Sequence, residues 1–86
     1  MELDGLLLRY FATANPSDLK PDALAAGIER CQVDLGLETD PGKRFALWSL
    51  LYMLGAAPEL TSVFEDEAER NAARSFMDLM AAAEGQ

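Results

Sequence analysis

The strongest constraint on how this chain folds is the segment 45–54, in which every residue except Ser49 is apolar. Asp40 and Pro41 precede this segment and Gly55 follows it, and these residue types start and stop helices respectively. The segment is therefore predicted to form a short helix, with Asp40 as its N-cap. Because this helix is apolar on all sides, it has to be buried on most of them. A chain of 86 residues has few other elements with which to cover it.

The rest of the chain carries apolar residues at helical spacing, and no segment alternates as a strand would. The predicted boundaries are a first helix ending at Asn15, Pro16 and Ser17, a second from Ser17 or Pro21 to Gly36, and a fourth beginning after Phe64. Asp66 and Glu69 are spaced as a capping box for the fourth helix, with Ser62 and Glu65 as a competing start. Gly36 is expected to end the second helix in the left-handed conformation. The fold class predicted is all-α, a compact four-helix-bundle-like single domain over residues 1–86 with a nearly all-apolar central third helix.

Each of the other three helices has one stripe that is predicted to be buried. These stripes are Leu3, Leu6, Leu7, Tyr10, Phe11 and Ala14 in the first helix, Leu24, Ile28, Cys31 and Leu35 in the second, and Ala68, Ala72, Phe76, Leu79 and Met80 in the fourth. Gly27 lies beside the second stripe, where the missing side chain lets another helix approach closely.

The central helix has two apolar faces when each residue advances by about 100°. Leu47, Leu50, Leu51 and Leu54 form an aliphatic stripe, and Phe45, Trp48 and Tyr52 form an aromatic stripe on roughly the opposite side, with Ala46, Ser49 and Met53 between them. The aliphatic stripe is predicted to be core. The aromatic stripe is either the other half of that core or a surface that meets another molecule.

The second interpretation predicts an interface at Phe45, Trp48, Tyr52 and Met53. A large exposed apolar patch usually marks an interaction surface, and aromatic residues and Met are enriched at interface cores. The simplest partner is a second copy related by a two-fold axis. The alternative is a small-molecule pocket near Trp48 and Tyr52, where hydrophobic walls and two polar atoms meet.

Lys43 and Arg44 lie in the first turn of the same helix, where positive charge opposes the helix dipole. One interpretation is that Glu38 and Asp40 neutralise them locally. The other is a small basic spot for a carboxylate or phosphate of a partner.

Composition excludes several functions. The chain has no His and one Cys, so it lacks the commonest general base, Ser–His and Cys–His pairs and a cysteine metal cluster. The acidic cluster at residues 65–69 lacks the ligand spacing of a calcium loop. A net charge of −8 argues against nucleic acid and anionic membrane surfaces as partners. Arg70 and Arg74 are explained by helix-surface pairing with Asp66 and Asp78. We therefore expect no enzyme activity, no cofactor and no metal.

An acidic four-helix chain of this size resembles an acyl carrier protein in its gross properties. That family carries its prosthetic arm on an Asp-Ser-Leu motif, whereas the nearest string here is Ser17-Asp18-Leu19, with the first two residues reversed. The resemblance is therefore limited to bulk properties. The sequence instead predicts a non-enzymatic protein-interaction module (an adaptor, regulator or inhibitor) that forms a homodimer in a cytoplasm. The Ala- and Leu-rich composition suggests a bacterial or bacterial-like source.

Overall fold

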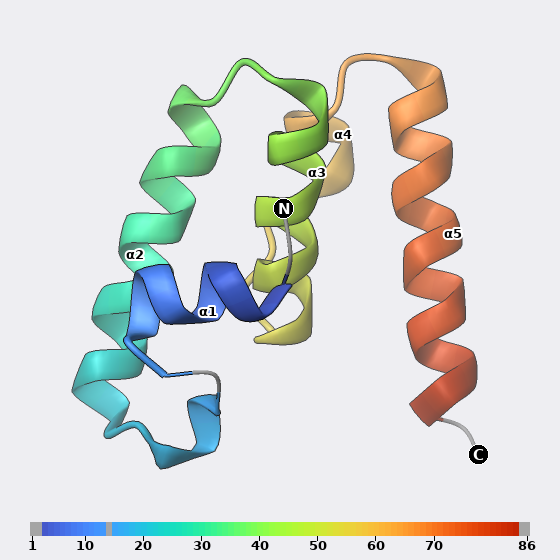
Figure 1. The fold of residues 1–86 in the computed structure, drawn as a ribbon. Coiled ribbons are helices and arrows are strands. Elements are labelled where there is room, and N and C mark those ends of the chain that lie inside the picture. The colour runs from blue at the N-terminus through green and yellow to red at the C-terminus, as the bar shows by residue number, and fades with distance from the viewer. Residues whose placement is uncertain (1–2, 14, 85–86) are drawn as a thin grey trace.

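The computed structural model describes residues 3–13 and 15–84 and is entirely helical over these ranges. Five α-helices and one 3-10 turn follow each other along the described chain (Figure 1): α1 (Leu3–Phe11), η1 (Pro16–Asp18), α2 (Pro21–Leu37), α3 (Pro41–Met53), α4 (Leu60–Val63) and α5 (Glu67–Glu84). The prediction of an all-α fold is confirmed. A regular four-helix bundle is not confirmed, because α1 crosses the other helices and the C-terminal half of α5 stands apart from them (Figure 1).

Helix α3 begins and ends as its flanking residues predict. The Asp40 carboxylate accepts a hydrogen bond from the Lys43 amide at 2.9 Å, which satisfies one of the unpaired donors of the first turn. At the other end Gly55 has a φ of +75°, and the Ala56 amide donates to the Leu51 carbonyl at 2.9 Å. These bonds close the helix through a left-handed glycine. Local signals therefore fix the position of α3 in the chain.

Helices α1 and α2 pack closely where Gly27 has no side chain. A Cβ atom built on Gly27 would collide with the ring of Phe11 and lie 2.9 Å from the Tyr10 carbonyl oxygen. The predicted close approach at Gly27 is confirmed. Helix α1 ends at Phe11, earlier than predicted, and the next residue, Ala12, has a φ of 59°. The side chain of Leu3 and residue Ala14 lie outside the described residues.

The predicted end of α2 at Gly36 is wrong. The helix continues to Leu37, and Glu38 is its C-cap, with its amide bonded to the Asp34 carbonyl. Among the described residues, Ala12 and Gly55 have a positive φ. Gly36 therefore has an ordinary helical backbone. The reason is a tertiary contact from Arg44, which is described below.

The core lies where α1, α2, α3 and the segment around α4 meet, and α5 contributes Ala73 to it. Its buried residues are Leu6, Leu7, Tyr10, Phe11, Cys31, Leu35, Leu47, Trp48, Leu50, Leu51, Val63, Phe64 and Ala73. The aliphatic stripe of α3 is core as predicted, apart from Leu54, which is half-buried. Burial of these side chains is the main source of the free energy of folding.

The buried stripe predicted for α5 is partly wrong. Ala73 is buried, Phe76 and Met77 are half-buried against the core, and Met80 is half-buried. Three residues of the predicted stripe, Ala68, Ala72 and Leu79, are exposed instead, with Leu79 70% exposed. Helix α5 is therefore rotated relative to the prediction. It keeps an apolar surface that no described part of the chain covers.

Candidate functional site

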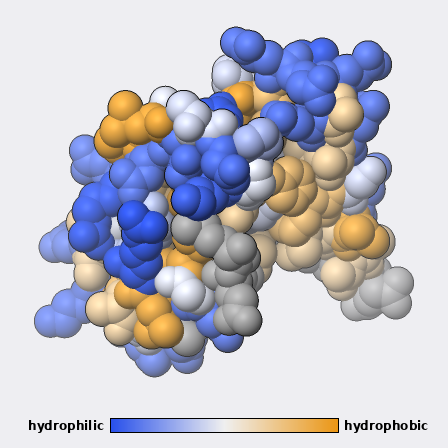
Figure 2. Space-filling model, turned by 45° about the horizontal axis from the view of Figure 1, so that its top comes forward, coloured by the Kyte–Doolittle hydropathy of each residue, from blue (hydrophilic) through white to orange (hydrophobic). Residues whose placement is uncertain are grey.

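One concave surface is an apolar hollow of about 330 Å³ between α1, α3 and α5. Its lining residues are Leu6 of α1, Gly42, Phe45, Ala46, Ser49 and Met53 of α3, and Phe76 of α5. The α3 residues recur every three or four positions and so form one face of that helix. Figure 2 shows apolar surface on the α5 lobe, beside a recess that separates this lobe from the rest of the molecule. We call the hollow lined by these seven residues the α1–α3–α5 hollow.

One polar group in the α1–α3–α5 hollow has no partner. The Ser49 side chain is buried, at 9% exposure, and its Oγ makes no hydrogen bond with any described residue. A buried hydroxyl without a partner costs about 1–3 kcal/mol, and such groups are rare in native structures. Ser49 is the one polar residue in the apolar segment of α3, and this was the sequence signal that could have marked it.

The residues expected at an interface differ in how deeply the single chain buries them. Trp48 is 1% exposed and its Nε1 donates to the Pro58 carbonyl at 3.1 Å, so it belongs to the core of the single chain. As a correction to the expected interface, Trp48 has no surface left for a partner. Tyr52 is half-buried and stacks on Trp48, with ring centroids 5.4 Å apart. Phe45 is half-buried and Met53 is 45% exposed, and both line the hollow.

A second depression lies near Trp48 and Tyr52, where the alternative prediction placed a small-molecule pocket. It has a volume of about 430 Å³ and is lined also by residues 57–61, Arg74 and Met77. The indole N–H, one of the two polar atoms expected to hold a ligand, is already bonded to Pro58. This leaves the depression with fewer free polar groups than the sequence suggested.

Arg44 joins three elements rather than presenting charge to a partner. Its guanidinium donates to the carbonyls of Leu35 at 3.0 Å, Glu38 at 2.9 Å and Val63. The first two carbonyls lie at the C-terminal end of α2, where the helix dipole attracts a cation and backbone acceptors are unpaired. Arg44 therefore extends α2 past Gly36 and anchors α4. Lys43 remains exposed at the surface.

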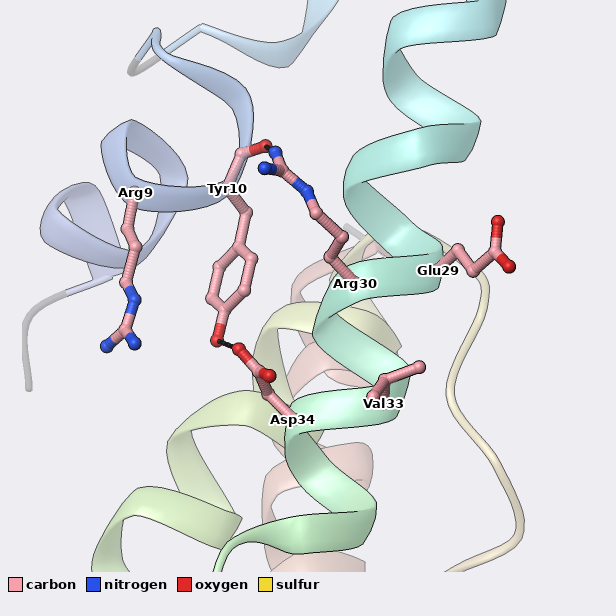
Figure 3. Close-up of a pocket in the computed structure, with 6 residues that line it drawn as sticks. All are labelled: Arg9, Tyr10, Glu29, Arg30, Val33 and Asp34. Atoms are coloured by element: carbon pink, nitrogen blue, oxygen red, sulfur yellow. Dashed lines mark hydrogen bonds between the residues drawn. The ribbon is translucent and has the colours of Figure 1, made fainter.

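A polar clamp joins α1 to α2 at a depression lined by Arg9, Tyr10, Glu29, Arg30, Val33 and Asp34 (Figure 3). The Tyr10 hydroxyl donates to the Asp34 carboxylate at 2.5 Å, and the Arg30 guanidinium donates to the Tyr10 backbone carbonyl. The Arg9 guanidinium lies 5.6 Å from the centre of the Tyr10 ring, which is cation–π distance. These contacts use the polar groups within the chain, so the clamp holds α1 in place.

Among the described residues, Tyr10 and Cys31 have raised pKa values. Burial, and then the hydrogen bond to Asp34, raises the pKa of the Tyr10 phenol far above its usual value. Burial, and then the charge of Asp34, raises the pKa of the Cys31 thiol to about 11. Tyr10 and Cys31 therefore both hold their protons at neutral pH.

The remaining charged candidates make local contacts. Arg70 donates to the Phe64 carbonyl at 3.4 Å and Arg74 to the Asn71 side chain at 3.2 Å, which replaces the predicted pairing with Asp66 and Asp78. Within residues 3–13 and 15–84, no group of three or more acidic, Cys or His side chains is placed to hold a metal ion. Over the same ranges no helix combines the length and apolar character needed to cross a bilayer.

Comparisons with known protein families, with curated proteins and with solved structures give no match to this chain.

Proposed function

We propose that this protein is a non-enzymatic interaction module that forms a homodimer through the apolar side of α3 and α5. In this role it would act as an adaptor, regulator or inhibitor. The observation that carries the proposal is the α1–α3–α5 hollow with the unpartnered hydroxyl of Ser49 at its wall. A surface of this kind is stabilised when a second molecule removes it from water.

The residues that support the interface differ in part from those of the sequence prediction. Phe45 and Met53 line the hollow and remain accessible, and Phe76 joins them from α5. Trp48 supports the surface from below, because its ring packs on Phe45 with centroids 6.3 Å apart and on Phe76 at 6.1 Å. The aromatic cluster thus gives the hollow a rigid floor, which lowers the entropy cost of binding.

The depression near Trp48 and Tyr52 supports a small-molecule function less well. Ligand pockets hold their ligands with a few convergent polar groups, and the Trp48 N–H is already satisfied within the chain.

The test is the mass of the protein in solution, measured by size-exclusion chromatography with light scattering. The wild type is expected to show twice the 9.4 kDa mass of one chain at high concentration. The Met53→Glu variant is expected to be monomeric at the same concentration, because it places a charge in the hollow. Since Met53 is 45% exposed, this change leaves the core intact.

Val33→Glu is the matched control. Val33 is 55% exposed on α2 and lines the separate depression at the α1–α2 clamp, so the variant adds the same charge away from the hollow. It is expected to dimerise as the wild type does. A wild-type mass of 9.4 kDa at every concentration, or equal dissociation of both variants, would contradict the proposal.

A further inference from the structure

We infer that the dimer interface is an antiparallel pair of α5 helices, one from each copy, related by a two-fold axis that passes between Ser75 and Phe76. This inference rests on the proposed homodimer and specifies the surface and the register that form it. It is carried by the part of α5 that the sequence pattern predicts to be buried and the single chain leaves exposed.

The exposed apolar residues of α5 form a continuous stripe. Ala68, Ala72, Leu79 and Ala83 are all exposed, and at about 100° per residue they fall within an arc of about 60°. No charged residue of α5 falls inside this arc. Arg70 and Arg74 lie on the opposite side of the helix, whereas Asp78 and Glu69 flank the stripe at about 110° and 70° from its centre. The stripe therefore offers a partner helix an apolar face without unpaired charges to bury.

The stripe is complementary to itself in one direction. With the two-fold axis between Ser75 and Phe76, Ala72 faces Leu79 of the second copy, and Ala68 faces Ala83 of the second copy. Each large Leu79 side chain thereby meets a small alanine, and the alanines let the two helices approach closely. A parallel pair would instead place the two Leu79 side chains against each other and leave the alanines facing alanines. The antiparallel register therefore packs each Leu79 against an Ala72 of the second copy and avoids the Leu79–Leu79 clash of the parallel pair.

The α1–α3–α5 hollow lies on the same side of α5 as this stripe. Phe76 lies between the core-facing side of α5 and the stripe, and it also lines the hollow. The α5 helix of the second copy therefore lies along the stripe and over the hollow. One partner helix accounts for both the exposed stripe and the hollow.

The surface area of the chain fits an incomplete unit. The accessible surface is 5572 Å², whereas a compact monomer of this mass has about 5,000 Å². The radius of gyration is 12.9 Å, against about 12 Å for a compact chain of this length. The chain thus exposes on the order of 500 Å² more surface than a compact monomer of this mass, as expected when a partner covers one of its helices.

Disulfide cross-linking tests the register directly. The double variant Ala72→Cys/Leu79→Cys has its two cysteines about 10.5 Å apart along one helix, too far for a disulfide within one chain. In the antiparallel dimer each cysteine faces its counterpart on the second copy. Mild oxidation is therefore expected to convert nearly all of the double variant into a covalent dimer on a non-reducing gel. Each single variant is expected to stay monomeric on the same gel, because like positions lie about two turns apart in this register.

Asn71→Cys/Asp78→Cys is the matched control, because it repeats the spacing at exposed positions of α5 about 100° around the helix from the stripe. It is expected to give no covalent dimer. Efficient cross-linking of the Ala72→Cys single variant would overturn the antiparallel register in favour of a parallel one. No cross-linking of the double variant, when light scattering shows a wild-type dimer, would overturn the α5 interface and leave the homodimer standing. A wild type that is monomeric by light scattering would overturn both.

Discussion

Replacing Arg44 with Met is expected to destabilise the fold by roughly 2–4 kcal/mol. The guanidinium donates to the carbonyls of Leu35, Glu38 and Val63, and the Arg44 side chain is half-buried. A hydrogen bond to a charged group contributes about 1.5–3 kcal/mol, and partial exposure reduces the sum over the three bonds. Met keeps the apolar stem, so the change isolates the charged head. A domain of this length has about 4–13 kcal/mol of stability in total, so the loss is a large fraction.

Urea unfolding measures this loss through the fluorescence of Trp48, the only Trp of the chain and a buried one. All variants are compared at one fixed protein concentration, because dimerisation contributes to apparent stability. Lys43→Met is the control, since it removes the same charge from the neighbouring exposed position. It is expected to change the free energy of unfolding by less than about 0.5 kcal/mol. If the free energies of unfolding of Arg44→Met and Lys43→Met differ by less than about 0.5 kcal/mol, the guanidinium does not hold α2, α3 and α4 together.

Three further changes have expected outcomes. Gly27→Ala forces the ring of Phe11 to move. Despite the better helix propensity of Ala, we expect urea unfolding to show a free energy of unfolding lower by about 1–3 kcal/mol. An unchanged urea midpoint would show that α1 can shift freely. Ser49→Ala removes an unpartnered hydroxyl and is expected to raise the thermal midpoint of the dilute monomer. A lower midpoint would mean that the hydroxyl is satisfied within the chain. The raised pKa of Cys31, about 11, means that the folded thiol holds its proton where the unfolded thiol loses it. The contribution of this thiol to the free energy of unfolding is therefore fully present below about pH 9 and is lost between pH 9 and 11. Cys31→Ala is expected to flatten this loss in a series of urea midpoints measured at different pH values.

The sequence predicts those elements whose limits are set locally. The start of α3 follows from the Asp40 side chain and Pro41, and its end follows from Gly55. The same holds for α5, where the Asp66 carboxylate accepts from the Glu69 amide at 3.3 Å. In each case the signal and the bond it makes lie within four residues of each other, so the pattern is sufficient.

The errors arise where a distant contact decides. Helix α2 continues past Gly36 because the guanidinium of Arg44 satisfies the carbonyl of Leu35, and this partner comes from another helix. The rotation of α5 has a different cause. Ala68, Ala72 and Ala73 each bury little area, so an alanine-rich pattern constrains the orientation of a helix only weakly. Packing against the aromatic cluster then selects Ala73 as the buried position.

The candidate site was predicted only in part for the same reasons. Phe45 and Met53 were expected at a contact surface, and both line the hollow. Trp48 is core because Phe64, which follows α4, packs against its ring with centroids 5.8 Å apart. Ser49 fell between the two faces of α3 and gained significance only when the structure left its hydroxyl without a partner.

The most direct test of the central claim is an isotope-filtered NMR experiment on a mixed sample of labelled and unlabelled chains. Such an experiment detects only contacts between copies. We predict an intermolecular cross-peak between the methyl groups of Leu79 and the methyl group of Ala72 on the other copy. The exposed methyl groups of Val33 are predicted to give none. Cross-peaks from Val33 with none from Leu79, or no intermolecular cross-peak at all at millimolar concentration, would contradict the account.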